Sequence, residues 1–354
     1  MCEIMNLYTE DGWLNYEEIR KQGCWLNIIV GARQVGKTYG VLKMIFDHPE
    51  TYAFLMRRSN EELEAIATDP TLNPFSPLKD SNITADIVKR SKKTWNWGWA
   101  EYDEDGKPTV TESRGIAMSL SALANLRGFS GSSFTDLIFD EFIPEQIVLK
   151  RKNEGETFLN AYTTINGNRE LAIKGHQPPL KCWLMANAFD LFSDILTVYG
   201  LTSDIAEMVK NGEEWKILDG GVFLCIPHSK KIIEERSETA QMKFLRKQKT
   251  ASNFLDMALN NSFSYNDTTS IRPKSLKGYR PLLRVGKIYA WECGTSIYFC
   301  KSAHRARECY TDLEDDLKRF RRNNIELGTL YVDGFITFSD AGTLQLFKKY
   351  LDIK

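Results

Sequence analysis

The segment GARQVGKT, Gly31 to Thr38, constrains the fold of this chain more than any other part of its sequence. It matches the pattern G-x-x-x-x-G-K-[ST], follows the apolar run from Trp25 to Val30 and precedes a helix-like segment from Tyr39 to Phe46. The two glycines let successive backbone N–H groups face a phosphate, and the following helix adds the positive end of its dipole. A strand, this loop and a helix in that order predict a P-loop that binds a nucleotide.

The loop residues have separate expected roles in binding ATP and Mg²⁺. Lys37 would reach the β and γ phosphates, the Thr38 hydroxyl would hold Mg²⁺, and Arg33 would add a second cation. The backbone of the loop supplies the remaining contacts. The predicted ATP-binding residues of the loop are Gly31, Ala32, Arg33, Gln34, Val35, Gly36, Lys37 and Thr38.

Hydrolysis needs two further groups, and the segment TDLIFDEF, residues 135–142, supplies both. Asp140 ends an apolar strand and is expected to contact the Mg²⁺ shell, while Glu141 can polarise the attacking water. An acidic turn after an ordinary strand is the alternative, but the P-loop upstream favours an ATPase. We therefore predict Thr38 and Asp140 as magnesium ligands, and Glu141 with Lys37 as catalytic residues.

Two polar residues farther along the chain are weaker candidates. Asn187 ends the apolar run CWLMAN, at the edge where ligands of an open α/β sheet collect, so it is predicted to sense the γ-phosphate or hold the water. An asparagine that caps the next turn is the alternative. Arg169 follows a helical segment and is a candidate arginine finger for a neighbouring subunit's nucleotide, or else an ordinary surface arginine.

The first half of the chain alternates short apolar runs with helical segments, which predicts an α/β fold with a mainly parallel sheet covered on both faces. Ser59 begins a capping box for one helix, and 156–166 has helical spacing. Residues 94–110 interrupt this alternation and predict a hairpin with a turn at Asp105-Gly106. The expected parallel strands are 25–30, 52–57, 134–142, 182–188 and 222–226.

Charge is distributed unevenly, although the net charge is only −1. Residues 1–228 carry 23 Lys+Arg against 32 Asp+Glu, whereas residues 229–354 carry 23 against 15. The basic half predicts a polyanionic partner, with improved solubility as the alternative. Six basic residues without an acid lie between 271 and 287, and we predict that they contact nucleic acid: Arg272, Lys274, Lys277, Arg280, Arg284 and Lys287.

These changes along the chain predict three regions: an ATPase domain at 1–228, a helical linker at 229–258 and a small α+β domain at 259–354. In the last region we expect two strands around Cys293-Gly294-Thr295, helices at 313–320 and 343–351, and a strand at 331–337.

Composition excludes several classes of protein. No apolar run approaches the roughly 18 residues of a membrane span, so we expect no membrane partner. The seven cysteines form no CxxC pair and only four histidines are present, which favours a reduced cytosolic compartment over a zinc site.

Five motifs in order, GARQVGKTY, FLMRRSNEEL, LIFDEFI, NRE and LMANAF, resemble the DNA-packaging ATPases of φ29-like tailed phages. The likeness continues more weakly through GKIYAWECGTSIYFCKSAH and the closing YVDGFITFSDAGTLQLFKKY. It implies an ATPase of the additional-strand, catalytic-glutamate group. In this family a pentameric ring binds the portal of an empty capsid and pumps double-stranded DNA inward. The resemblance places the family's lysine and threonine on Lys37 and Thr38, and its acidic pair on Asp140 and Glu141. It places the trans-acting arginine on Arg169 and the polar sensor on Asn187.

The resemblance also implies a C-terminal domain like a ribonuclease-H-like nuclease that has lost its catalytic acids. Glu292 and Asp333 are the only carboxylates expected within its strands, too few for a two-metal centre, so no nuclease activity is expected. The implied location is the host cytoplasm, with transient binding to the procapsid. Some members dock on a packaging RNA, which these residues leave open. The alternatives are a general nucleic-acid translocase or helicase, a non-catalytic nucleic-acid-binding protein, and a nuclease with an ATPase helper.

Overall fold

The computed structural model describes residues 5–32, 35–123, 131–143, 153–187, 193–247 and 270–353. The chain divides into two compact units, each with its own sheet and core. The first consists of Met1–Asp190 and Met208–Ser264, and the second of Leu191–Glu207 and Tyr265–Lys354. None of the helices in the described ranges has the length and apolar character needed to cross a membrane.

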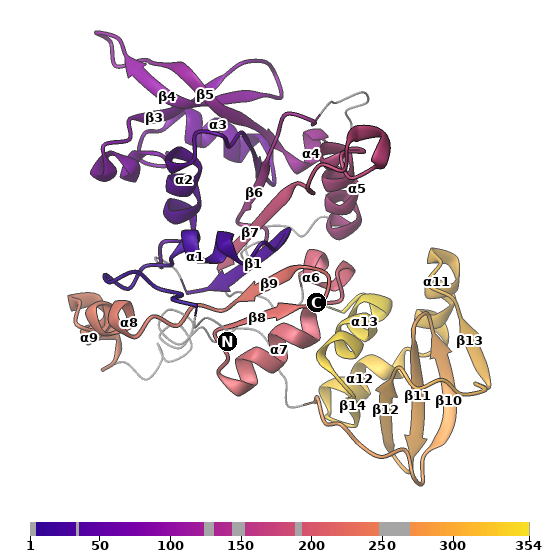
Figure 1. The fold of residues 1–354 in the computed structure, drawn as a ribbon. Helices are drawn as coiled ribbons and strands as arrows, with labels where there is room; N and C mark the ends of the chain where they lie inside the picture. Colours follow the sequence, from indigo (N-terminus) through magenta and orange to yellow (C-terminus); the bar gives the residue numbers. More distant parts are fainter. Residues whose placement is uncertain are drawn as a thin grey trace. The chain divides into compact units, whose positions relative to one another are not determined.

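The first unit is built on a nine-stranded sheet with the order β3-β4-β5-β2-β6-β7-β1-β9-β8 (Figure 1). The strands β5, β2, β6, β7, β1 and β9 run parallel, while β3, β4 and β8 are antiparallel to their neighbours at the two edges. Strand β7 lies between β6 and β1, which is the additional strand that the resemblance implied. The strands are β1 Leu26–Gly31, β2 Ala53–Arg57, β3 Ala85–Lys89, β4 Trp95–Tyr102, β5 Pro108–Ser119, β6 Asp136–Asp140, β7 Lys181–Asn187, β8 Trp215–Leu218 and β9 Val222–Cys225.

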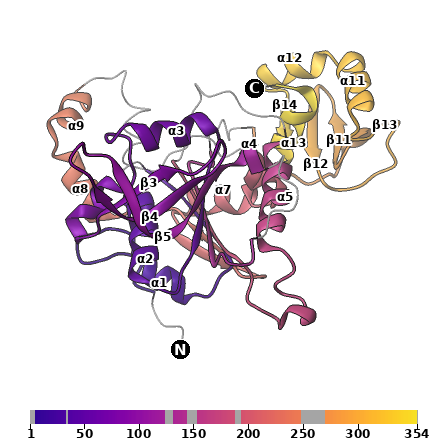
Figure 2. The same cartoon turned by 90° about the horizontal axis from the view of Figure 1, so that it is seen from above.

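The central strands are apolar throughout because helices cover both faces of this sheet. Every residue of β1 and β6 is buried. Figure 2 shows α1 (Tyr16–Lys21) and α2 (Lys37–Asp47) on one side and α5 (Glu154–Asn166) on the other. On the α2 side Ile29 and Ile138 join one core, and on the α5 side the rings of Phe139 and Phe158 lie 5.6 Å apart. The predicted α/β fold with a mainly parallel sheet is confirmed.

Smaller elements complete the first unit. Ser59 caps α3 by accepting a hydrogen bond from the backbone N–H of Glu62 at 3.2 Å, as the capping-box pattern predicts. The structure describes residues 229–247 of the predicted linker, and most of these residues are helical, in α8 and α9. The remaining helices of this unit are α3 Asn60–Thr68, η1 Ser76–Ser81, α4 Leu120–Leu123, η2 Ala172–Lys174, α7 Thr202–Asn211 (shared with the second unit), α8 Lys230–Ser237 and α9 Ala240–Leu245.

The predicted hairpin is β4 and β5, and it is joined to the main sheet. Its turn includes Gly106, whose φ of 75° favours glycine. Strand β5 pairs with β2 only from Gly115 to Ser119, so the rest of the hairpin extends beyond the start of β2. Strand β3 was not predicted. It pairs with the outer side of β4, where Trp95 and Trp97 are buried.

The second unit has a five-stranded sheet with the order β13-β10-β11-β12-β14. A meander of three antiparallel strands lies at its centre, and β13 and β14 add to it in parallel. Its core includes Phe299, Phe338 and Phe347. Its elements are α6 Asp194–Val198, β10 Arg280–Val285, β11 Ile288–Cys293, β12 Ser296–Cys300, β13 Glu308–Tyr310, α11 Glu314–Asn323, α12 Glu326–Val332, β14 Ile336–Phe338 and α13 Ala341–Leu351.

One prediction for the second unit was wrong. The segment 331–337 is not a single strand, because Tyr331 and Val332 end helix α12 and only Ile336–Phe338 forms β14. Gly334, with φ 79°, makes the turn between them. Asp333 therefore lies at the end of a helix rather than in a strand, whereas Glu292 is in β11 as expected.

Candidate nucleotide site

The carboxyl ends of the parallel strands carry most of the residues predicted to bind a nucleotide. Gly31 ends β1 and is paired in register with Asn187, the last residue of β7, and Asp140 ends β6. Because parallel strands end at one edge of the sheet, these residues and the loop after β1 meet there. Arg33 and Gln34 in that loop lie outside the described residues.

Lys37 is folded against its own loop. Its ammonium donates to the carbonyl oxygens of Gly31 at 3.2 Å and Ala32 at 2.5 Å, and to Oδ1 of Asn187 at 3.1 Å. The residue is only 8% exposed, so its charge requires such acceptors. These contacts hold a cation at the mouth of the loop, where phosphate oxygens would compete for the same donors.

The loop is held in shape from the N-terminal segment. Gly36 has φ 80°, and a Cβ added there would lie 3.1 Å from Cε3 of Trp13. The hydroxyl of Tyr16 donates to the carbonyl oxygen of Lys37 at 2.8 Å, at the start of α2. Burial raises the pKa of Tyr16 well above its ordinary value, so the hydroxyl remains a donor. Ala32 and Val35, which belong to the loop, are themselves buried.

Thr38 and Asp140 form the oxygen-lined side of the site. The Thr38 hydroxyl donates to Oδ2 of Asp140 at 3.0 Å, so two residues 102 positions apart in the chain are in direct contact. Mg²⁺ prefers carboxylate and hydroxyl oxygens together with phosphate and water oxygens. The pair therefore fits a magnesium ion shared with a nucleotide.

The side chains of Asp140 and Glu141 share one cation, Arg57, which was not among the predicted site residues. Nη1 of Arg57, the last residue of β2, lies 3.1 Å from Oδ2 of Asp140 and 3.3 Å from Oε2 of Glu141. Burial lowers the pKa of Arg57, but the two carboxylates outweigh it, so this pKa lies above its ordinary value. Glu141 has φ 57°, a left-handed conformation that costs a non-glycine residue about 1–2 kcal/mol. The signal available in FLMRRSNEEL was an arginine at the carboxyl end of an apolar strand.

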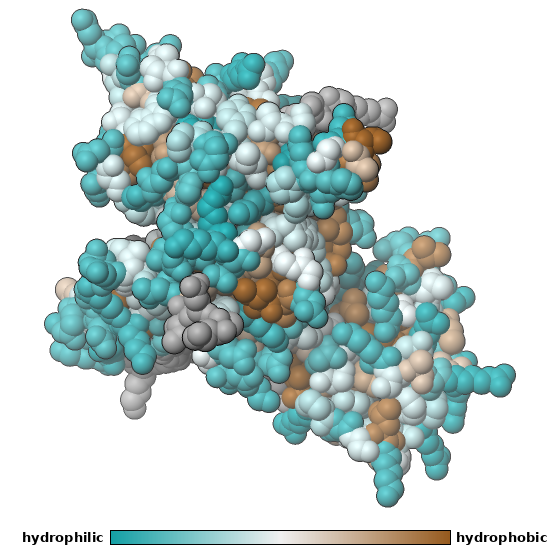
Figure 3. Space-filling model, in the orientation of Figure 1, coloured by the Kyte–Doolittle hydropathy of each residue, from teal (hydrophilic) through white to brown (hydrophobic). Residues whose placement is uncertain are grey.

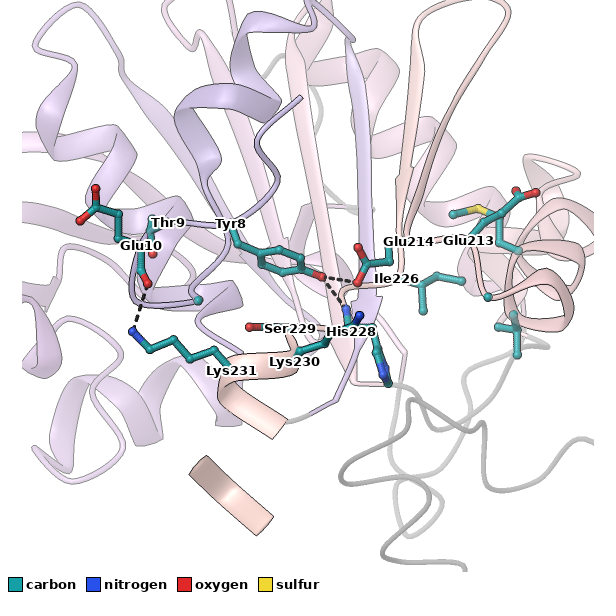
Figure 4. A pocket seen from close by; sticks show the side chains of 14 residues that line it. Tyr8, Thr9, Glu10, Glu213, Glu214, Ile226, His228, Ser229, Lys230 and Lys231 are labelled. Atoms are coloured by element: carbon teal, nitrogen blue, oxygen red, sulfur yellow. Dashed lines mark hydrogen bonds between the residues drawn. The ribbon is translucent and has the colours of Figure 1, made fainter. Parts of the chain in front are cut away.

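A cavity of about 790 Å³ opens at the same edge of the sheet (Figure 4). It is lined by the N-terminal segment around Tyr8, by the end of α7 and the residues that follow it, and by the segment from the end of β9 to the start of α8. The Tyr8 hydroxyl donates to Oε1 of Glu214 at 3.0 Å and accepts from the backbone N–H of His228 at 2.6 Å. Gly12 lines the cavity, and the next residue, Trp13, is the one that a Cβ on Gly36 would contact. The cavity is therefore adjacent to the phosphate loop and is large enough for a nucleoside.

Arg169 lies at the opposite edge of the sheet from the phosphate loop. Its guanidinium donates to the carbonyl oxygens of Phe134 at 2.7 Å, Gly131 at 3.0 Å and Asn166 at 3.0 Å. Burial lowers the pKa of Arg169 from its ordinary value, and the residue is only 8% exposed. Phe134 precedes β6, and Asp140 ends it about 20 Å away at about 3.3 Å per residue. Arg169 is thus remote from its own chain's site, and contact with another subunit's nucleotide would require it to release these carbonyls.

The six basic residues predicted to bind nucleic acid belong to the second unit and are all exposed. Arg284 lies 5.6 Å from the ring of Tyr289 and donates to the carbonyl oxygen of Gly286. Lys274 donates to the Thr337 hydroxyl at 3.0 Å and borders a shallow cavity of about 440 Å³. Lys301 also lines that cavity.

The sheet topology and the contacts of Lys37, Thr38 and Asp140 are consistent with a P-loop ATPase fold. No protein-family model matches the chain. It is 24% identical over 267 residues to the DNA packaging protein of Bacillus phage B103, covering 74% of this chain and 70% of that protein. It is 22% identical over 353 residues to the DNA packaging protein of Bacillus phage phi29, covering 94% and 93% of the two chains.

A solved structure titled the bacteriophage Phi-29 viral genome packaging motor assembly has the same fold, with a TM-score of 0.62, 17% identity and coverage of 96% and 98%. The resemblance to the packaging proteins of φ29-like phages, predicted from the motifs, is confirmed.

Proposed function

We propose that this chain is an ATP-driven double-stranded DNA translocase that packages a viral genome into a preformed capsid. The observation that carries the proposal is the convergence of Lys37, Thr38, Asp140 and Asn187 at one edge of the sheet. It occurs in a chain that is similar over nearly its whole length to a phage DNA packaging protein. The geometry supports the nucleotide chemistry of the proposal, and the similarity supports DNA packaging as its purpose.

In this proposal the phosphate loop works by exchanging partners. Lys37 would leave the carbonyl oxygens of Gly31 and Ala32 and bind the β and γ phosphates of ATP. Thr38 and Asp140 would hold Mg²⁺, which neutralises charge on the phosphate oxygens when bound. Asn187 shares the Lys37 ammonium, so it is positioned to respond to the γ-phosphate. The cavity around Tyr8 would take the nucleoside.

Glu141 is the proposed general base that orients and polarises the attacking water. Its side chain is 56% exposed, so water can reach it, and Arg57 fixes its direction from the protein side. Because the same guanidinium also binds Asp140, the two carboxylates are positioned by one rigid group.

Arg169 is proposed to complete the site of the next subunit in a ring. Its distance from its own phosphate loop supports action between subunits rather than within one. Subunits that fire in turn would then couple hydrolysis to movement. By analogy with the φ29-like family, we propose a homopentameric ring at the phage portal in the host cytoplasm. A packaging RNA is a further candidate partner.

The exposed basic residues of the second unit are proposed to grip DNA through its phosphates. A motor that must move any genome needs contacts that do not depend on base sequence, and Lys and Arg contacts to the backbone have that property. The proposal does not include nuclease activity.

The first test is steady-state ATP hydrolysis with and without double-stranded DNA, on wild type beside Glu141→Gln and Arg169→Ala. We expect DNA to stimulate the wild type and both variants to lose that stimulation. A total ATPase rate that stays linear in protein concentration, with Arg169→Ala no slower than wild type, contradicts the shared site. Strand separation on free DNA without a capsid favours the alternative, a general helicase or translocase. Failure to package DNA into procapsids overturns the packaging function.

A further inference from the structure

The turn between β3 and β4 presents a concentrated positive charge that the nucleotide site does not use. Its four cations occupy five positions and are all exposed: Lys89, Arg90, Lys92 and Lys93. Lys89 pairs with Glu64 at 2.5 Å, whereas the other three have no ion pair within the described residues. We call residues 89–94 the basic turn.

The backbone of the basic turn is ordered by its own short polar residues. The N–H groups of Arg90 and Ser91 both donate to the carbonyl oxygen of Thr94, at 2.9 and 3.0 Å. The hydroxyls of Ser91 and Thr94 lie 2.6 Å apart. The charges are therefore held on a defined loop rather than on a free tail.

The turn between β4 and β5 carries the opposite charge. Residues 101–107, the acidic arm, contain four exposed carboxylates and one lysine. The Asp103 carboxylate accepts from the N–H groups of Asp105 and Lys107, at 3.0 and 2.8 Å, and so folds the tip. Among the described residues, Glu101, Glu104 and Asp105 have no ion-pair partner. The projection at the upper left of Figure 3, in the region of β4 and β5, is hydrophilic.

The two charged turns lie at opposite ends of the strands. Lys89 is paired with Trp95, Trp95 with Ala117 and Ala117 with Leu55, so the basic turn emerges at the edge where β2 ends in Arg57. That is the edge of the phosphate site. The acidic arm is at the other edge, where Pro108–Arg114 pass the start of β2 by about 23 Å at about 3.3 Å per residue.

Arg169 and the phosphate site also lie at opposite edges of the sheet, as the two charged turns do. Arg169 binds the loop before β6 at the edge of the acidic arm, and the phosphate site lies at the edge of the basic turn. Both turns adjoin β4, whereas Arg169 and the phosphate site both adjoin β6. When the amino edge of one subunit faces the carboxyl edge of the next, arm meets turn while Arg169 faces the neighbouring phosphate site. This is a head-to-tail contact, the type that generates a ring when the rotation between subunits closes.

We propose that the acidic arm of one subunit docks on the basic turn of the next. The inference rests on the ring of the proposed function, and it names the surface that sets the order of the subunits. Opposite charges speed and orient such an encounter, and the contact weakens as salt screens exposed charges.

Charge reversal tests the docking in the full-length chain. The arm variant is Glu101→Lys, Glu104→Lys and Asp105→Lys. The turn variant is Arg90→Glu, Lys92→Glu and Lys93→Glu. A third protein combines all six changes, and a matched control reverses three exposed cations elsewhere in the first unit: Lys210, Arg246 and Lys247. Sedimentation velocity at low and high salt measures assembly, and ATP turnover per subunit with DNA and procapsids measures the completed site.

We expect the arm variant and the turn variant each to raise the protein concentration for half-assembly at least about tenfold, because like charges then face each other. The combined protein should recover assembly and ATP turnover, and the control should match wild type in both. When all the proteins are monomeric, they should have the same melting temperature. Recovery also shows that the substituted turns still fold.

Three outcomes overturn the docking. Assembly of the arm variant as in wild type is the first, and a combined protein that stays as weak as the single variants is the second. The third is a turn variant that loses only DNA stimulation, which would make the basic turn a DNA contact. In each case a wild type that assembles and hydrolyses ATP leaves the proposed function intact. A wild type that does neither, with DNA and procapsids present, overturns both.

Discussion

Replacing Arg57 with glutamine is the sharpest test of how Asp140 and the proposed general base Glu141 are positioned. Arg57 is the last residue of β2, and its guanidinium lies 3.1 Å from Oδ2 of Asp140 and 3.3 Å from Oε2 of Glu141. Glutamine keeps much of the length of the side chain but removes its charge. The change therefore separates the role of the cation from the packing of the strand.

The expected loss of stability follows from the burial of the two partners. Asp140 is buried, and a hydrogen bond to a buried charge contributes about 1.5–3 kcal/mol. The Glu141 side chain is 56% exposed, so its pair with Arg57 contributes below about 1 kcal/mol. Asp140 keeps the Thr38 hydroxyl as a donor. We expect Arg57→Gln to lower the free energy of unfolding by about 2–3 kcal/mol, measured by urea denaturation without nucleotide.

The effect on hydrolysis should be larger than the effect on binding. Loss of the group that orients Glu141 should lower kcat about 10²-fold, while KM for ATP changes little because Arg57 does not belong to the phosphate loop. If Arg57 acts through Glu141, the double variant with Glu141→Gln should be no slower than Glu141→Gln alone. Arg246→Gln, at an exposed arginine in the same unit, is the matched control.

Two results would refute this reasoning. A variant with normal kcat but reduced stability would make Arg57 a structural residue only. Independent, multiplicative losses in the double variant would mean that Arg57 does not act through Glu141.

Three further changes probe other parts of the molecule. Gly36→Ala should abolish tight binding of an ATP analogue in equilibrium titration, because φ 80° disfavours alanine and the new Cβ would crowd Trp13; unchanged affinity would contradict this account of the loop. Glu154→Gln should lower the free energy of unfolding by about 3–5 kcal/mol in chemical denaturation, since it breaks the buried pair with Arg58 at 2.7 and 3.1 Å; a loss below about 1 kcal/mol would mean that the pair is not buried in solution. Lys277→Ala should reduce the salt dependence of DNA binding by about one phosphate contact without changing sequence preference, and an unchanged slope would exclude Lys277 from the interface.

Local patterns in the chain were enough to predict the phosphate loop and most of the parallel strands. The loop pattern is short and contiguous, and its glycines have a conformational reason that does not depend on the rest of the molecule. Apolar runs of strand length report burial on both faces, which is why β1, β2, β6, β7 and β9 were found near their true limits. The start of the helix at Ser59 could also be predicted, because the capping hydrogen bond joins residues close together in the chain.

Residues that act through distant partners could not be predicted in the same way. Tyr16 lies in no motif, and the motif FLMRRSNEEL does not by itself assign a role to Arg57. Each acquires its role only when another strand or helix brings its partner within hydrogen-bond distance. Strand β3 was missed because its recognition depends on pairing with β4. Residues 331–337 were misread because an apolar run of that length is compatible with the end of a helix and with a strand.

The sequence by itself determined where the phosphate-loop pattern lies, that the sheet is mainly parallel, and that the resemblance is to phage packaging proteins, because these properties depend on contiguous residues. Tertiary structure alone decided which cation holds Glu141. It also placed Arg169 at the edge opposite its own phosphate loop. These facts depend on strand order and direction, which bring together or separate residues far apart in the chain. No local pattern encodes such distances.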